Sequence, residues 1–224
     1  MIQCREPPKR EDWLMRREKS GGVFWQLPPG YEEIDGWDLL RNRKQFLAVN
    51  GLSLLIVVIM VIWGLFLHPV HFSFADGAWL RFFCKAAVFL IAAVAYMALH
   101  EGVHGILIRL FSGRPARYGV GFGYAYAASD AYFDRVRYLI IALAPVIIWG
   151  VVLCLLLRAF PAWFWVLYGV QILNLSGASG DYFVAVSMLR LPAGSLVRDS
   201  GTKMRIYVPA AERQTKEKSG NFGE

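Results

Sequence analysis

Two histidines and a glutamate lie close together in the apolar stretch "YMALHEGVHGILIRLF", which runs from Tyr96 to Phe111. Their spacing is His-Glu-x-x-His, at His100, Glu101 and His104. Because positions i and i+4 share one face of a helix, the two imidazoles can bind a single metal ion. Glu101 beside them can take a proton from a water molecule that the metal activates, which is the chemistry of zinc hydrolases. The alternative is a polar helix end at the membrane surface, with no bound ion.

A zinc site needs at least three protein ligands, and the segment 162–189 offers a third. Asp181 stands in this otherwise apolar segment, and an isolated carboxylate within a membrane needs a partner, for which a metal ion is suitable. Counted back from the ends of their segments, Asp181 and the histidines lie at a similar depth, since a helix rises about 1.5 Å per residue. We therefore predict Asp181 as the third ligand. The alternative is an ion pair with Arg190 or a hydrogen bond to a backbone group.

Asn174 precedes Asp181 by two helical turns and has two interpretations. Its amide could hold a substrate backbone or an oxyanion, or it could only form a hydrogen bond across the helix bundle. Between the two polar residues lie Gly177 and Gly180, each preceded by a serine. Small residues at this spacing predict a surface on which two helices approach closely.

The elements that carry these residues are predicted to cross a membrane. The chain has 224 residues, of which 56% are hydrophobic, and its mean hydropathy is +0.40. Four apolar stretches are each long enough to cross a hydrocarbon core of about 30 Å, and they cover residues 46–67, 82–111, 138–157 and 162–189. The sequence thus predicts an all-α integral membrane protein with four transmembrane helices, and it places the candidate metal ligands on the second and fourth.

The basic residues predict the orientation of this domain, which spans residues 46–190. Arginines and lysines concentrate before the first span, between spans two and three, and after the fourth span, so the positive-inside rule places both termini in the cytoplasm. Residues 1–45 are then a cytoplasmic N-terminal segment and residues 191–224 a flexible cytoplasmic tail. The net charge of +7 fits an anionic membrane surface, and we see no nucleic-acid module. His68 and His71 fall on the outer side, away from the motif, as interfacial residues.

The loop between spans two and three alternates small residues with large ones. This period of two is typical of a strand, and it involves Tyr118, Val120, Phe122, Tyr124 and Tyr126. A turn at Ser129-Asp130 and a short return strand would complete a β-hairpin on the cytoplasmic side. Its edge could hold an extended substrate by β-augmentation, or its aromatic side chains could simply form an interfacial belt.

The combination of both motifs resembles a known class of enzymes. His100-Glu101-x-x-His104 in one span, followed by Asn174 and Asp181 in a later one, is similar to the site-2 proteases, which are intramembrane metalloproteases. It resembles more closely a small bacterial membrane family of zincin peptidases, a domain of unknown function, over roughly residues 82–190. The resemblance implies that His100, His104 and Asp181 bind Zn²⁺ and that Glu101 is the catalytic base. Gly177 stands where the class usually has proline, and no glycine follows Asp181.

These observations predict an intramembrane zinc metalloprotease of the bacterial cytoplasmic membrane. Its partners would be membrane lipids and a membrane-protein or peptide substrate, while its oligomeric state is not set by the sequence. Two alternatives belong to other classes. One is a catalytically silent scaffold that binds metal, and the other is a small proton-coupled transport or assembly subunit in which Glu101 and Asp181 carry protons.

Overall fold

The computed structural model describes residues 22–37, 42–70, 77–121, 124–192, 194–201 and 203–210. Its helices are α2 (Arg43–Leu67), α3 (Ala78–Ser112), α4 (Arg135–Ala159), the 3-10 turn η1 (Pro161–Trp163), α5 (Phe164–Gly177) and α6 (Ser179–Leu189). Its strands are β1 (Val23–Phe24), β2 (Tyr31–Trp37), β3 (Arg117–Gly121), β4 (Tyr124–Ala128), β5 (Tyr132–Asp134), β6 (Leu196–Asp199) and β7 (Met204–Pro209).

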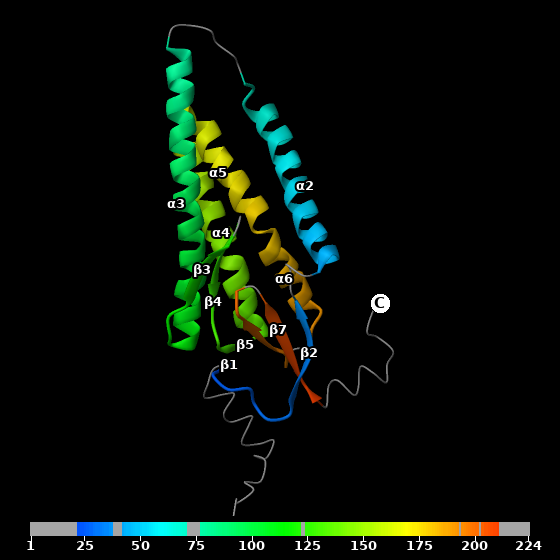
Figure 1. Cartoon of the computed structure of the whole chain (residues 1–224). Helices are drawn as coiled ribbons and strands as arrows, with labels where there is room; N and C mark the ends of the chain where they lie inside the picture. The colour runs from blue at the N-terminus through cyan, green and yellow to red at the C-terminus, as the bar shows by residue number, and fades with distance from the viewer. Residues whose placement is uncertain are drawn as a thin grey trace, which may run out of the picture.

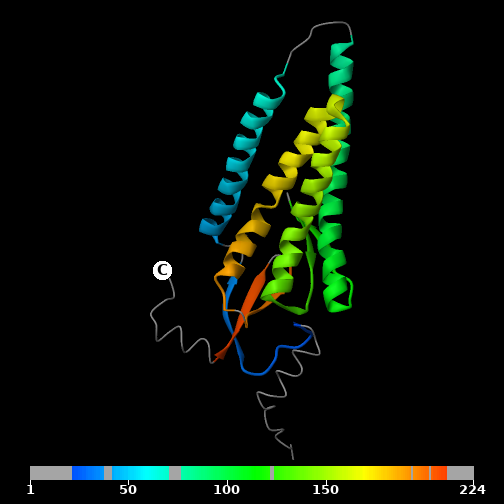
Figure 2. The ribbon, with the colours of Figure 1, turned by 180° about the vertical axis from the view of Figure 1, so that it is seen from behind.

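The long helices run side by side, and a β-sheet closes one end of the bundle. In both views α4 and α5 lie in the middle, with α3 on one side and α2 on the other (Figures 1 and 2). The helix α6 continues from α5 toward the sheet (Figure 1). Both polar motifs therefore lie on helices that extend down to the sheet end of the molecule.

The first three predicted spans are helices long and apolar enough to cross a membrane, namely α2, α3 and α4. The predicted fourth span is not one continuous helix, because the chain breaks at Ala178 into α5, with 14 residues, and α6, with 11. At about 1.5 Å per residue neither piece alone crosses about 30 Å. The four-span prediction is therefore not confirmed, and the interruption falls just before Asp181.

The all-α prediction missed a five-stranded antiparallel sheet with the strand order β1-β5-β6-β7-β2. Two of its interior strands, β6 and β7, come from the segment that we expected to be a flexible tail, and the edge strands β1 and β2 come from the predicted N-terminal segment. The tail prediction is wrong for these strands because their apolar side chains are buried, among them Leu196, Val197 and Ile206. Residues 211–224 lie outside the described residues.

The loop between α3 and α4 folds differently from the predicted hairpin. The strands β3 and β4 pair antiparallel with each other, and residues 122–123 between them lie outside the described residues. The predicted turn at Ser129-Asp130 instead leads from β4 to β5, which pairs with β1 and β6 of the large sheet. Asp130 forms ion pairs with Arg117 of β3 and Arg198 of β6, so this turn links the two sheets.

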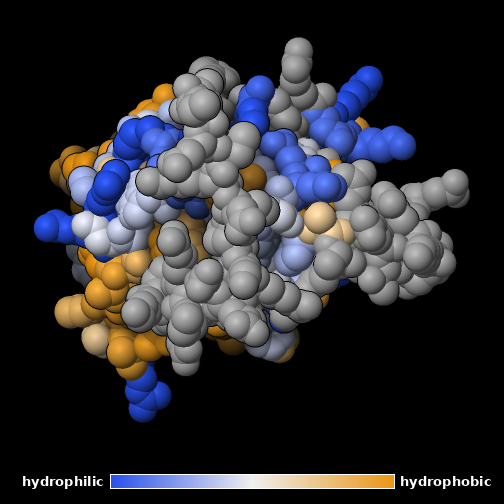
Figure 3. All heavy atoms as spheres, turned by 90° about the horizontal axis from the view of Figure 1, so that it is seen from below, coloured by the Kyte–Doolittle hydropathy of each residue, from blue (hydrophilic) through white to orange (hydrophobic). Residues whose placement is uncertain are grey.

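A hydrophobic core lies between the large sheet and the adjacent ends of the helices. Its buried members include Ile108 of α3, Phe133 of β5, Ile141 of α4, Met188 of α6 and Val197 of β6. Viewed from this end, hydrophilic side chains gather on the described part of the face, and hydrophobic side chains flank it (Figure 3). This core fixes the positions of α3, α4 and α6 relative to one another.

Candidate metal site

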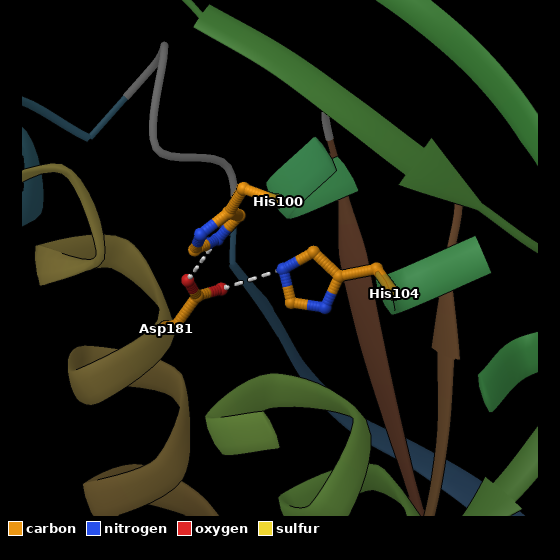
Figure 4. Close-up of side chains that lie close together, drawn as sticks. All are labelled: His100, His104 and Asp181. Atoms are coloured by element: carbon orange, nitrogen blue, oxygen red, sulfur yellow. Dashed lines mark hydrogen bonds and ion pairs between the residues drawn. The ribbon is translucent and has the colours of Figure 1, made fainter. Parts of the chain in front are cut away.

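Three predicted ligands come together where α3 faces the start of α6. The Nε2 atom of His100 lies 3.4 Å from Oδ2 of Asp181, and the Nε2 atom of His104 lies 3.7 Å from its Oδ1, as Figure 4 shows. One ligand atom from each of the three residues lies within 4.8 Å of the others. Both histidines are buried, with 8% of each exposed, while the side chain of Asp181 is 26% exposed. The cluster is thus compact and open on the side of the carboxylate.

The helix break positions Asp181. Because α6 begins at Ser179, Asp181 lies in its first turn, where the positive end of the helix dipole stabilises a carboxylate by about 0.3–1 kcal/mol. The Ser179 hydroxyl donates a hydrogen bond of 2.6 Å to the Ser176 carbonyl at the break. The predicted close helix approach at Gly177 and Gly180 is wrong, since a Cβ added to either would meet nothing within 4 Å. These glycines border open space beside the cluster.

The second ring nitrogen of His104 faces a backbone carbonyl on α4. Its Nδ1 atom lies 2.8 Å from the oxygen of Ile141. That oxygen is four residues before Pro145, which lies inside α4 and has no N–H to donate to it. The proline therefore leaves the Ile141 carbonyl without its helical donor, and His104 takes that place.

The second ring nitrogen of His100 faces a side chain that the sequence analysis did not identify. Its Nδ1 atom lies 2.8 Å from the hydroxyl of Tyr96, one turn earlier on α3, and this hydroxyl donates a hydrogen bond of 2.8 Å to Oδ1 of Asn174. Asn174 in turn donates from Nδ2 to the Val146 carbonyl at 3.2 Å. Asn174 has no exposed surface. Of its two interpretations, the structure shows the hydrogen bond within the bundle.

Glu101 lies beside the cluster and next to the short sheet. Its side chain is partly buried, and its carboxyl group lies next to the backbone of Ala127 in β4. A Cβ added to the neighbouring Gly102 would meet nothing within 4 Å. Glu101 therefore lies beside β4, next to a position on α3 where there is room for an added Cβ.

A carboxylate of the large sheet is hydrogen-bonded to α4. Asp199 of β6 accepts hydrogen bonds from the Tyr138 hydroxyl and from the backbone N–H of Gly201, at 2.7 Å. Burial raises the pKa of Asp199, and these two hydrogen bonds oppose that effect. The sheet thus presents an anchored acidic group to the helices, a feature absent from the sequence prediction.

The remaining sequence candidates lie elsewhere. His68 follows the end of α2 that is remote from the sheet and stacks on Phe164, with ring centroids 4.9 Å apart. His71 lies outside the described residues. Arg190, the alternative partner of Asp181, follows α6 roughly two and a half turns further on. Asp181 faces the two histidines instead.

Helices long and apolar enough to cross a membrane thus bring two histidines and an aspartate together, as a group that could hold a metal ion. Residues 93–196 match the model of a family described as "Putative zincin peptidase", so this part of the chain is similar to that family. The match includes Tyr96, Asn174 and all three residues of the cluster. Comparisons with curated proteins and with solved structures gave no match.

Proposed function

We propose that the protein is an intramembrane zinc metalloprotease that hydrolyses peptide bonds of membrane-associated substrates. The observation that carries this proposal is the convergence of His100, His104 and Asp181, with ligand atoms within 4.8 Å of one another, beside the carboxylate of Glu101. The family match over residues 93–196 supports the same class of chemistry.

The donor set of the cluster suits zinc. Two imidazole nitrogens and one carboxylate are ligands that catalytic zinc sites use, and such sites keep a further position open for water or substrate. The side chain of Asp181 is 26% exposed, so the cluster can be reached on the side of this carboxylate. When the His104 ring is neutral, the lone pair of its Nε2 points at a carboxylate oxygen 3.7 Å away, and the two repel each other. A cation between them removes this repulsion.

When bound, zinc supplies Lewis acidity that brings the pKa of water near neutrality and polarises a substrate carbonyl. The protein's own residues do the rest. The carboxylate of Glu101 accepts the proton of the attacking water and returns it to the leaving amine. The backbone of Ala127 in β4 lies next to its carboxyl group, and β4 and β3 form a candidate surface for an extended substrate.

The membrane location is supported by α2, α3 and α4, which are long and apolar enough to cross a bilayer. The charge distribution supports cytoplasmic termini, with the cluster in the cytoplasmic half of the membrane and lipids covering the helices. Substrates would then be membrane proteins or peptides that reach the cluster from within this half of the bilayer.

The test is metal analysis combined with hydrolysis of fluorescent casein by the full chain in detergent micelles. We expect one zinc per chain, lost in His100→Ala, and retention of zinc with a 10²–10⁴-fold lower rate in Glu101→Gln, a range typical of general acid–base groups. Wild-type protein that binds no zinc, or a Glu101→Gln variant with normal activity, would contradict the proposal. A silent scaffold would bind zinc without hydrolysis, and a proton-carrying subunit would work without zinc.

A further inference from the structure

We propose that α4, which contributes no residue to the metal cluster, fixes the tautomers of both histidines, and that Tyr96 and Asn174 are positioning residues for His100. This inference rests on the proposed zinc site and goes beyond it. In this proposal Asn174 orients the ligand His100 and does not contact the substrate.

A chain of hydrogen bonds, which we call the relay, runs from the Val146 carbonyl on α4 through Asn174 and Tyr96 to His100. A carbonyl oxygen only accepts hydrogen bonds, so the atom of Asn174 that lies 3.2 Å from it must be the amide nitrogen, Nδ2. The other end of the same amide, Oδ1, then faces the Tyr96 hydroxyl at 2.8 Å. Because Oδ1 is an acceptor, it must take the single proton of that hydroxyl.

The direction of the next hydrogen bond follows. Since the Tyr96 proton points to Asn174, the Tyr96 oxygen is left as an acceptor for Nδ1 of His100 at 2.8 Å. Nδ1 of His100 must therefore carry the ring proton. In the neutral ring, Nε2 then carries the lone pair, and Nε2 is the atom that lies 3.4 Å from Asp181.

The same helix determines the other histidine by a shorter route. The Ile141 carbonyl, freed by Pro145, accepts from Nδ1 of His104 at 2.8 Å. In their neutral form both rings thus direct the lone pair of Nε2 toward the cluster. Partners of this kind around metal-ligating histidines fix ring orientation, and their loss lowers metal affinity about 10–100-fold.

Burial excludes a direct substrate role for the relay. Asn174 has no exposed surface, and Tyr96 is 7% exposed. The donor and acceptor ends of the Asn174 amide both have partners inside the bundle. A substrate could reach neither group unless α3, α4 and α5 separated.

The first test measures the tautomer of His100 directly in metal-free protein, by heteronuclear NMR of the full chain in micelles with isotope-labelled histidine. The chain has only 4 histidines, and single His→Gln variants assign their signals. We expect protonated Nδ1 on His100 and His104 in the wild type. Tyr96→Phe should convert the His100 signals to a mixture of tautomers and leave those of His104 unchanged.

The matched control is Tyr168→Phe. This substitution also removes the hydroxyl of a buried tyrosine. That hydroxyl donates a hydrogen bond of 2.8 Å to the Met60 carbonyl, at the contact between α5 and α2. Zinc affinity should fall about 10–100-fold in Tyr96→Phe and remain at the wild-type value in Tyr168→Phe. Unprotonated Nδ1 on wild-type His100, or a Tyr96→Phe variant with wild-type tautomer and affinity, would overturn the inference. Absence of zinc binding by the wild type would instead overturn the proposed function.

A pair of substitutions at Asn174 provides a second, independent arm. In Asn174→Asp, a carboxylic acid kept neutral by burial can accept from Tyr96 and donate to Val146, so the tautomer and zinc affinity should stay near the wild-type values. Asn174→Leu can do neither and should reproduce the effect of Tyr96→Phe. If both variants kept wild-type tautomer and zinc affinity but lost hydrolysis, Asn174 would act on the substrate and the inference would be wrong.

Discussion

The two ends of the molecule use the same residue types in opposite ways. At the sheet end, Phe133 of β5 is 1% exposed in a core that joins the sheet to α3, α4 and α6. At the other end, Phe83 near the start of α3 is 63% exposed. Exposed apolar side chains cover α2 and much of α3, while water-soluble proteins expose few such continuous surfaces.

The difference lies in what covers the apolar side chains. Packing against protein stabilises the sheet end as in a soluble domain, whereas the apolar side chains of the other end lie on helices that are long and apolar enough to cross a membrane. The candidate metal cluster lies between them. Its histidines belong to a helix that passes through both regions, and the sheet core holds the end of this helix firmly in place.

The largest expected effect comes from removing a packed phenylalanine at the sheet end. Phe133→Ala should lower the free energy of unfolding by about 3–5 kcal/mol, because it leaves a cavity in the core. Phe83→Ala, the matched change on the apolar exterior, should change it by less than about 1 kcal/mol. Thermal and denaturant unfolding in micelles measure both. Equal losses would mean that the two ends are packed alike.

An intermediate effect is expected where α2 contacts α5. A Cβ added to Gly64 would lie 2.4 Å from Cε1 of Tyr168, so Gly64→Ala should displace the helices and cost about 1–3 kcal/mol. Gly51 on the same helix has nothing within 4 Å of an added Cβ, and Gly51→Ala should be neutral or stabilise by about 1 kcal/mol. The same unfolding experiment distinguishes them, and similar values for both would show that α2 is not docked at Gly64.

The smallest expected effect concerns the polar link between the two sheets. Hydrogen bonds from Arg198 and Arg117 lower the pKa of Asp130 below its ordinary value of 3.8. Since the folded pKa is depressed, the stabilisation is complete well above pH 3.8 and disappears as the pH falls through the lower, folded-state pKa. Asp130→Asn should lose less than about 1 kcal/mol at neutral pH, because the pairs are exposed.

The measurement is the difference in unfolding free energy between wild type and Asp130→Asn across the acid range. The difference should shrink as the pH falls below 3.8, the ordinary pKa of the group. A difference that stayed constant would show that the carboxylate charge does not contribute. Phe133→Ala should retain its large effect at neutral and at acid pH, because it removes no charge.

The candidate metal cluster could largely be predicted from the sequence, because the patterns that indicate it are local. The i, i+4 spacing of His100 and His104 holds in any α-helix, and a carboxylate in an apolar segment singles out Asp181. The helix break at Ala178 was harder to predict. Glycines on both sides of it, at Gly177 and Gly180, suggested close helix packing, yet they border open space where α5 ends and α6 begins.

The sheet escaped prediction for a different reason. The strands β6 and β7 are short, and they follow the last helix in a segment rich in charged residues, so a local pattern could not distinguish them from a tail. Their apolar residues become buried only when β5, from the loop between α3 and α4, supplies a partner. Pairing between segments this distant in the sequence is a property of the whole chain.

By itself, the sequence determined which helices are apolar and which residues can bind a metal, because composition and periodicity act within single segments. Only the tertiary structure decided how those ligands are oriented. Tyr96, Asn174 and the carbonyls of Val146 and Ile141 come from three helices, and they meet only when these helices dock at one rotation and depth. Tyr96 and His100 are one turn apart on α3, but the other three contacts connect different helices. Because hydrogen bonds reach only about 3 Å, the docking of α3, α4 and α5 decides those three.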